Sequence, residues 1–347
     1  MKMKKIIVLS LIVFSLFTAC HNQPWDFPDF DYTTVYFPYQ TPVRTLILGE
    51  DIYDNTLDND HKCRIMATMG GVYANEEDRI LDVVVDNSLC NNLKFDSDSG
   101  ANVMPMPESY YSLDQSMQIV IPAGAESGGI EVQLSDAFFA DPLAIKNTYV
   151  IPLRIQSVTN ADSILRGNPN ISNADPRIVD EWADAPMDYV LYCVKYINPW
   201  HGAYLRRGVD VGKGNNGNTA LDTTLVYSNE YVERDQVVYM NTISMDEVAL
   251  SLVTRDKGSD DDVPFELKIK IGADGKCQVS GADGASYSAT GSGEFVNDGD
   301  EWGNKARDVM YLNYTVDFGT STHNMTDTLV VRDRNVKIET FTPVVIR

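Results

Sequence analysis

The sequence predicts an all-β protein, with a β-sandwich followed by an antiparallel β-barrel or a second sandwich. Short strand-like runs, rich in β-branched and aromatic residues, recur along the chain between Gly, Pro, Asn and Asp. No segment shows the apolar periodicity of a full-length helix. Hydrophobic residues make up 44% of the chain and aromatic residues 10%, which is enough to fill buried cores.

The N-terminus has the layout of a signal peptide. Residues 1–5 are cationic, and residues 6–19 form an apolar run that ends in small residues directly before Cys20. This run is shorter than the roughly 20 residues that a membrane-spanning helix needs. We therefore expect residues 1–19 to be removed and Cys20 to be lipidated; a plain signal peptide is the alternative. Residues 20–33, rich in Pro, Asp and aromatic residues, would form a tether.

Residues 34–197 are predicted to form the sandwich domain. The segment 129–134 alternates apolar and polar side chains, as a strand with one buried face does. The segment 118–121 is followed by Pro-Ala-Gly, which ends a strand in a turn. The other predicted strands are Thr34–Phe37, Leu46–Leu48, Lys62–Met66, Leu81–Val85, Tyr149–Ile155 and Asp188–Ile197.

A long polar segment, residues 159–186, lies before the last of these strands. A loop of that length is uncommon in a compact domain, so it is either functional or a domain border. One short helical turn is expected within residues 176–183. Because a strong strand follows the segment, we place the border after that strand, at Asn198-Pro199.

Residues 198–347 are predicted to form the second domain. Asp274-Gly275 and Asp283-Gly284 are turn dipeptides of the kind that close hairpins. Short turns between successive strands favour an up-and-down barrel or a sandwich. The predicted strands are Ala203–Arg207, Thr224–Tyr227, Gln236–Asn241, Glu247–Thr254, Phe265–Ile271, Lys276–Ser280, Thr290–Val296, Val309–Phe318 and Asp327–Val331.

The formal charge of −22 argues against binding to nucleic acid or to anionic membrane surfaces. Contact with the membrane is therefore expected through the lipid anchor alone. Cys63, Cys90, Cys193 and Cys277 show no CxxC or zinc-ligand spacing. Sequence cannot select among their three possible full pairings, and we expect free cysteines rather than a disulfide framework.

No catalytic constellation stands out, so we predict that the protein is not an enzyme. No pair of carboxylates is singled out by its spacing, no Gly-x-Ser-x-Gly motif occurs, and the histidines lack metal-ligand spacing. No cofactor is expected. Calcium is the one possible exception, because Asp96 and Asp98 alternate with serines as in a calcium loop, although the loop lacks the distal Glu.

Three segments carry a resemblance to a known group of proteins. The run 121–155 contains Ile-Pro-Ala-Gly, Leu-Ser-Asp-Ala-Phe-Phe-Ala-Asp-Pro and Thr-Tyr-Val-Ile-Pro-Leu-Arg-Ile. It resembles the N-terminal domain of unknown function of Bacteroidetes surface lipoproteins, which also precedes the catalytic barrel of some endo-β-N-acetylglucosaminidases. Residues 200–208 and 326–333 resemble the C-terminal domain of the same lipoproteins.

Such lipoproteins are similar to those encoded beside SusC/SusD-type glycan uptake systems. The resemblance implies an immunoglobulin-like first domain, a lipocalin-like second domain, and an outer-membrane lipoprotein that binds glycan or assists its capture. Display at the cell surface is expected rather than on the periplasmic face. The acidic residues Asp26, Asp29 and Asp31 follow Cys20 later than in many surface-exported lipoproteins, which leaves the periplasmic alternative open.

Sugar binding needs an aromatic platform and polar groups that fix the hydroxyls. Trp302, in a loop of polar residues and glycines, and Trp182, in the long polar segment, are candidate platforms. Each has the alternative of folding back onto its own domain. The densest cluster of candidates is His201, Tyr204, Arg206 and Arg207, with Trp200 directly before it as a further candidate.

Tyr204 and Arg206 would share one face of a strand. On that face Arg206 would either bind an anionic sugar or stabilise the barrel while Trp200 and Tyr204 fill its base. The sequence therefore predicts a non-catalytic glycan-binding protein. Alternatives are a structural or adhesin-like protein-interaction module and a small-molecule carrier with an apolar barrel cavity.

Overall fold

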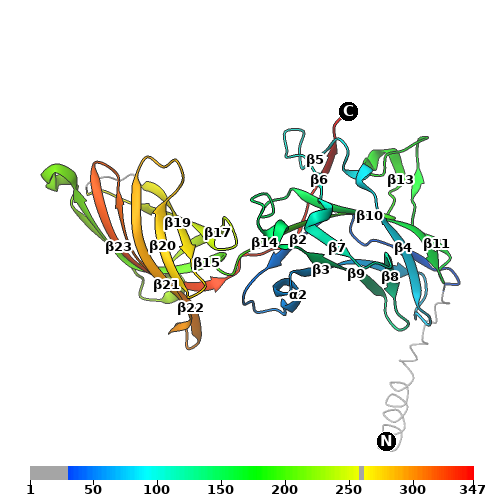
Figure 1. The fold of residues 1–347 in the computed structure, drawn as a ribbon, viewed down its shortest axis with the longest axis horizontal. Coiled ribbons are helices and arrows are strands. Elements are labelled where there is room, and N and C mark those ends of the chain that lie inside the picture. The colour runs from blue at the N-terminus through cyan, green and yellow to red at the C-terminus, as the bar shows by residue number, and fades with distance from the viewer. Residues whose placement is uncertain (1–29, 258–261) are drawn as a thin grey trace, which may run out of the picture.

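The computed structural model describes residues 30–257 and 262–347. The predicted signal peptide, the lipidation site Cys20 and most of the tether therefore lie outside the described residues. The predicted all-β class is confirmed, with 53% of residues in strands and 9% in helices. The chain forms a sandwich followed by a closed barrel (Figure 1).

The first domain is built on two main sheets, beside two sheets of two strands each. The first sheet has the order β11-β1-β3-β9-β7, formed by Ser163–Ile164, Thr34–Tyr36, Lys62–Gly70, Ser127–Leu134 and Tyr111–Leu113. The second has the order β24-β2-β14-β10-β4-β8, with β6 beside β10. Its strands are Glu339–Thr340, Pro42–Ile47, Tyr189–Ile197, Tyr149–Thr159, Arg79–Val85, Gln118–Ile121 and Met104–Pro105. Short helices α2, α3, η1 and η2 cover Thr56–Asn59, Asp136–Phe139, Asn87–Cys90 and Glu108–Tyr110.

The sandwich core forms where alternate side chains of the two sheets meet. Strand β14 is buried on both faces, which explains its nearly continuous apolar sequence. Tyr192 and Val194 belong to the core between the sheets. Leu191 and Cys193 point the other way, into a second cluster that Phe341 helps to fill.

The long polar segment is folded onto the first domain. It contains β12 (Asn168–Pro169), β13 (Trp182–Asp184) and the single 3-10 turn η3 (Val179–Glu181), so the expected helical turn is present. Arg177 anchors it by donating to the carbonyl oxygens of Leu89 and Asn91 at 3.0 and 2.6 Å.

The second domain is an eight-stranded antiparallel barrel with the order β15-β17-β18-β19-β20-β21-β22-β23. Strands β15 and β23 close it through twelve residue pairs, and β16 continues beside β15 beyond β17. The strands β15 to β23 are Gly202–Gly214, Thr223–Tyr227, Gln236–Thr242, Glu247–Thr254, Val263–Ile271, Lys276–Gly281, Ser288–Glu301, Ala306–Asp317 and Ser321–Asp333. Turns η4, η5 and η6 are Asn215–Gly217, Thr219–Leu221 and Val232–Arg234.

The C-terminal tail returns from the barrel to the first domain, as the red segment in Figure 1 shows. Strand β24 pairs with β2, and β25 (Pro343–Val345) pairs with β5 (Leu93–Phe95). The sequence-based domain range 198–347 therefore differs from the observed pairing, because the barrel strands end at Asp333 and the tail completes the sandwich. A two-residue strand among polar residues has no signature that would have predicted this return.

The four cysteines of the described residues are free and buried, as expected. Burial raises the pKa of Cys63, Cys90 and Cys193 to about 12, so these thiols stay protonated and unreactive. Within residues 30–257 and 262–347, no helix is long and apolar enough to cross a membrane.

Candidate ligand-binding site at the junction of the two domains

The two domains are joined through a short linker between β14 and β15. Asn198 in this linker is fully buried, and its side-chain amide donates to the carbonyl oxygens of Ser244 and Glu247 at 2.9 and 3.0 Å. These bonds attach the linker to the hairpin between β17 and β18. Gly49 lies against Pro199 with a φ of +83°, and a Cβ there would be 2.7 Å from the Pro199 Cβ. Only glycine allows this close approach.

Arg334, the residue after β23, bridges the first domain and the linker. Its guanidinium donates to the carbonyl oxygens of Leu48 at 3.0 Å and Glu50 at 2.7 Å. It also donates to the carbonyl oxygens of Asn198 at 2.6 Å and His201 at 2.9 Å. These charge-assisted bonds tie the first domain to the linker through one side chain.

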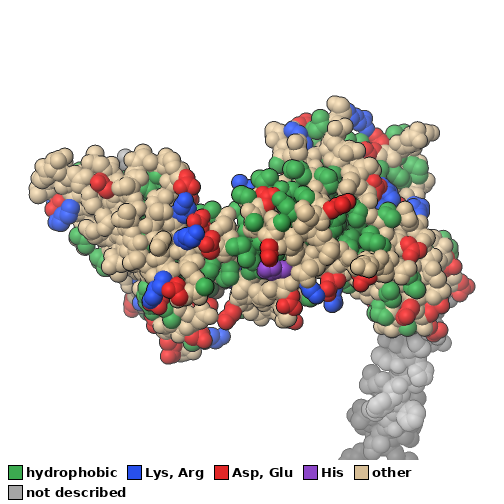
Figure 2. Space-filling model, in the orientation of Figure 1, with side chains coloured by type: hydrophobic (Ala, Val, Ile, Leu, Met, Phe, Trp, Pro, Cys, Tyr) green, Lys and Arg blue, Asp and Glu red, His purple; other side chains and the backbone are tan. Residues whose placement is uncertain are grey.

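A pocket of about 390 Å³ lies beside this junction. Figure 2 shows that the molecule narrows between its two domains. Trp200 forms an aromatic wall; it is half-buried and packs edge-on against Phe295, with ring centroids 6.4 Å apart. Tyr204 lines the barrel side, and its hydroxyl donates to the Trp200 carbonyl at 2.7 Å. This hydrogen bond holds the backbone of Trp200 in place.

Polar side chains from both domains complete the pocket wall. Glu50 comes from the first domain, whereas Asp274, Asn297 and Asp308 come from the loops and strand ends of the barrel. The Asp308 carboxylate accepts from the backbone N–H of Asp298 at 2.9 Å, which orients it. The pocket therefore combines an indole surface with carboxylate and amide groups that can bind hydroxyls.

His201 lies beside the pocket but does not line it. Its Nδ1 accepts a hydrogen bond from the backbone N–H of Thr242 at 3.1 Å. Burial, together with the charges of Arg334 and Lys195, lowers the pKa of His201 to about 4. The neutral ring thus holds β17 against the linker.

Arg206 lies inside the barrel and is fully buried. Its guanidinium binds both carboxylate oxygens of Asp327, at 2.8 and 3.1 Å, and lies 3.7 Å from the centroid of the Tyr227 ring. Tyr314 donates its hydroxyl to the same carboxylate at 2.6 Å. Gly208 leaves room for Asp327, because a Cβ there would be 2.0 Å from its Oδ1. Arg206 therefore does not reach the junction pocket.

The remaining tryptophans lie elsewhere. Trp302 is half-buried in the hairpin between β21 and β22, with the Arg207 guanidinium 5.0 Å from its ring centroid. Trp182 donates its indole N–H to the Asp175 carbonyl at 2.8 Å and so braces the polar segment. Of the predicted ligand-binding residues, the structure brings Trp200 and Tyr204 into one pocket and leaves His201, Arg206, Trp182 and Trp302 outside it.

Asp96, one of the two candidate calcium ligands, makes hydrogen bonds within the protein instead. Asp96 exchanges two 2.8 Å hydrogen bonds with Thr342, one through its backbone N–H and one through its carboxylate, so it holds the C-terminal tail. Asp98 is exposed. Among the residues that the structure describes, no group of three or more His, Cys, Asp or Glu side chains could hold a metal ion.

A buried histidine cluster at the far end of the barrel was not predicted from the sequence. His323 places Nδ1 2.8 Å from Asp210, and Nε2 3.3 Å from both Asp256 and Ser321. The order Ser–His–Asp resembles a hydrolase triad, but Ser321, His323 and Asp210 are at most 1% exposed. No substrate reaches the hydroxyl in this conformation, and the cluster holds strands β15, β18 and β23 together.

Comparison with known proteins found two family matches. A domain of unknown function (DUF5627) matches residues 199–335, and a family described as an N-terminal domain matches residues 30–162. The expected N-terminal domain followed by a distinct C-terminal domain agrees with these matches. A Bacteroides ovatus protein of unknown function is 40% identical with a TM-score of 0.84, and the match covers 91% of this chain and 100% of that protein.

Weaker similarities were found to two further solved structures. A second Bacteroides ovatus protein of unknown function is 15% identical with a TM-score of 0.38, over 89% of this chain and 99% of that one. An auxiliary nutrient binding protein of Bacteroides thetaiotaomicron is 14% identical with a TM-score of 0.38, over 86% and 95%. Both similarities are too weak to support a functional inference. No match was found among curated proteins.

Proposed function

We propose that this chain, which belongs to the same family as the 40% identical Bacteroides ovatus protein, is a non-catalytic binding protein of the cell envelope that holds a glycan between its two domains. The observation that carries the proposal is the junction pocket of about 390 Å³, with half-buried Trp200 on one wall. An indole presents an apolar face to the C–H groups of a sugar ring. The surrounding carboxylate and amide groups supply hydrogen-bond partners for its hydroxyls.

The proposal includes attachment to the outer membrane through a lipid on Cys20, at the cell surface. The motif that supports it is the cationic start, the short apolar run and the small residues before Cys20. A SusC/SusD-type uptake system would be the partner that receives the glycan. These two statements rest on the sequence pattern and on the family resemblance.

One feature supports binding without catalysis: the buried Ser321–His323–Asp210 cluster is closed to substrates. The barrel interior also does not support the small-molecule carrier, because Arg206, Tyr314 and Phe265 occupy inward positions where an apolar cavity would be needed.

Glycan arrays and affinity gels with host and plant polysaccharides test the proposal. We expect binding to at least one polysaccharide, and a loss of affinity of about tenfold or more on Trp200→Ala, as for a buried aromatic anchor. Trp302→Ala is the matched control, because Trp302 is also half-buried but lies outside the pocket. Phe295→Leu changes the same pocket wall while keeping an apolar side chain, so it tests the pocket even if Trp200→Ala fails to fold. The absence of any bound glycan would refute the proposal.

A further inference from the structure

The barrel wall is open along part of one strand pair. Strands β18 and β19 pair over eight residues, whereas β17 and β18 pair only through Met240–Thr242 and Val248–Leu250. Residues 236–239 keep their partners in β15, and residues 251–254 keep theirs in β19. The two strands therefore separate over these residues and leave a gap in the wall.

The backbone groups facing this gap follow from strand alternation, in which the N–H and C=O of one residue point to the same neighbour. Ile243 donates its backbone N–H to Glu247 across the hairpin, while Thr242 donates to His201 on the opposite side. The odd-numbered residues of β17, Val237 and Tyr239, hence face β18. By the same alternation, Ser251 and Val253 of β18 face β17.

The paired register of β17 and β18 ends before these edges. Among the described residues it joins Met240–Thr242 to Val248–Leu250 and does not reach 236–239 or 251–254. On the β18 side, the Val253 carbonyl accepts a hydrogen bond from the Tyr227 hydroxyl of β16 at 3.1 Å. The neighbouring interruption between β19 and β20 differs, because the Tyr287 hydroxyl accepts from the Glu266 N–H at 2.6 Å and donates to its carbonyl at 2.9 Å.

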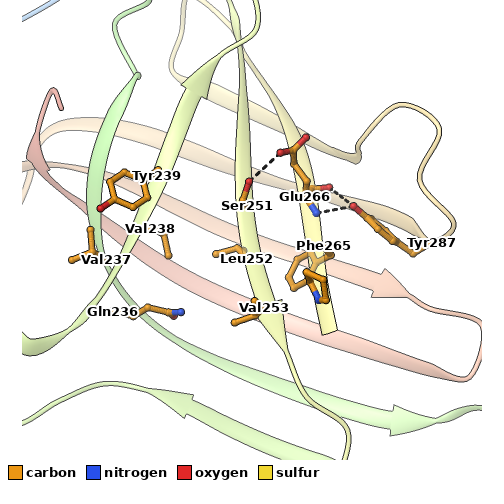
Figure 3. A pocket seen from close by; sticks show the side chains of 11 residues that line it. Gln236, Val237, Val238, Tyr239, Ser251, Leu252, Val253, Phe265, Glu266 and Tyr287 are labelled. Carbon is orange, nitrogen blue, oxygen red and sulfur yellow. Dashed lines mark hydrogen bonds between the residues drawn. The ribbon is translucent and has the colours of Figure 1, made fainter. Parts of the chain in front are cut away.

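Side chains turn the gap into a lined pocket of about 470 Å³ (Figure 3). Inward-facing Val238, Leu252 and Phe265 form an apolar floor, and each is at most 4% exposed. Tyr239, which is 47% exposed, and Glu266 stand at the rim. The site thus presents two strand edges over an apolar surface.

We propose that this gap is a docking site for an extended segment of a partner protein, which adds as a strand along the edges of β17 and β18. A peptide backbone is the ligand that repeats N–H and C=O groups at the spacing of a strand edge, and its alternate side chains would enter the apolar floor. Glu266 at the rim and the formal charge of −22 favour a segment with basic residues at its ends.

A synthetic peptide tests the proposal on the full mature chain. The probe is fluorescein-labelled Ac-Lys-Val-Thr-Val-Thr-Val-Lys-amide. The control is the same peptide with N-methylated valines, which keeps the side chains but lacks the backbone N–H donors of those residues. We expect saturable anisotropy with the first peptide below about 1 mM, and affinity lower by about tenfold or more for the second. Hydrogen exchange should slow at Val237, Tyr239, Ser251 and Val253, whose N–H groups face the gap. Equal binding of both peptides, no binding, or unchanged exchange in these residues would overturn the proposal.

An engineered disulfide between β17 and β18, which can be oxidised and reduced, provides a second test. Continuing the register of Met240 with Leu250 places Tyr239 opposite Ser251, so Tyr239→Cys combined with Ser251→Cys allows a disulfide that draws the edges together. The native cysteines of the described residues are buried and do not compete. Oxidation should lower peptide affinity about tenfold or more and reduction should restore it. Equal affinity in the two states would contradict strand addition.

Discussion

At the scale of single residues, the buried ion pair inside the barrel supports the stability of the protein only while both charges are present. Arg206 and Asp327 are both fully buried, and removal of one charge leaves the other unpaired in a dry interior. We expect Asp327→Asn to lower the free energy of unfolding by about 3–5 kcal/mol, and Arg206→Met with Asp327→Leu to recover most of that loss. Urea unfolding measures both. The exposed pair Lys268–Asp283 is the control: Asp283→Asn should cost less than about 1 kcal/mol. A single variant as stable as the wild type would contradict the prediction.

His201 at the junction and His323 in the barrel should contribute to stability with opposite pH dependences. Burial lowers the pKa of His323, but the hydrogen bonds and charges of Asp210 and Asp256 outweigh it and raise the pKa above 6.5. Its contribution to stability is therefore complete below that value and lost as the pH rises through the folded pKa. His201, with a pKa of about 4, instead loses stability as the pH falls from 6.5 towards 4.

Urea unfolding across this pH range separates the two contributions. We expect His323→Gln to remove the decline in stability on the alkaline side and to leave the acid side unchanged. His201→Gln should do the reverse. A decline on the alkaline side that persists in His323→Gln would show that another group causes it.

At the scale of elements, the returning tail is predicted to stabilise the sandwich and not the barrel. Phe341 is 3% exposed and packs edge-on against Phe95, with ring centroids 4.7 Å apart. Phe341→Ala should cost the first domain about 3–5 kcal/mol through the cavity it leaves. Ile338→Ala is the control, because Ile338 is fully exposed and a change there should stay within about 0.5 kcal/mol. Hydrogen exchange resolves the domains, and faster exchange in barrel strands instead of sandwich strands would contradict the assignment.

Most strands could be predicted because their signals are local. The alternation in 129–134 and the Asp274-Gly275 turn each identify an element from a few neighbouring residues. The tail strand β24 could not be predicted, because its pairing with β2 joins residues some three hundred positions apart and two residues carry no periodicity. The gap between β17 and β18 was missed for a similar reason: both strands were recognised, but their separation depends on what each pairs with on its other side.

At the scale of the whole molecule, the candidate site was only partly predictable. Trp200 and Tyr204 stood out because aromatic residues clustered beside a predicted border. Phe295, Asp308 and Glu50 did not, because barrel closure and domain docking bring them together from distant segments. Arg206 shows the opposite case: it lies in the same dense cluster, yet its partner Asp327, 121 residues away, holds it inside the barrel. Composition indicates which residues can bind a ligand, whereas the pairing of strands decides which of them reach a pocket.

We predict that the relative position of the two domains depends on Arg334, since this one side chain links the carbonyl oxygens of the first domain with those of the linker. Arg334→Met removes all four charge-assisted hydrogen bonds but keeps an unbranched apolar stem. We expect the distance distribution from small-angle X-ray scattering to broaden, and glycan affinity to fall because Glu50 and Trp200 no longer keep fixed positions. Arg332→Met is the matched control, because Arg332 is 54% exposed and its ion pair within the described residues is with adjacent Asp333. If Arg334→Met scatters as the wild type does while glycan affinity falls, the residue acts on the pocket locally and does not set the arrangement of the domains.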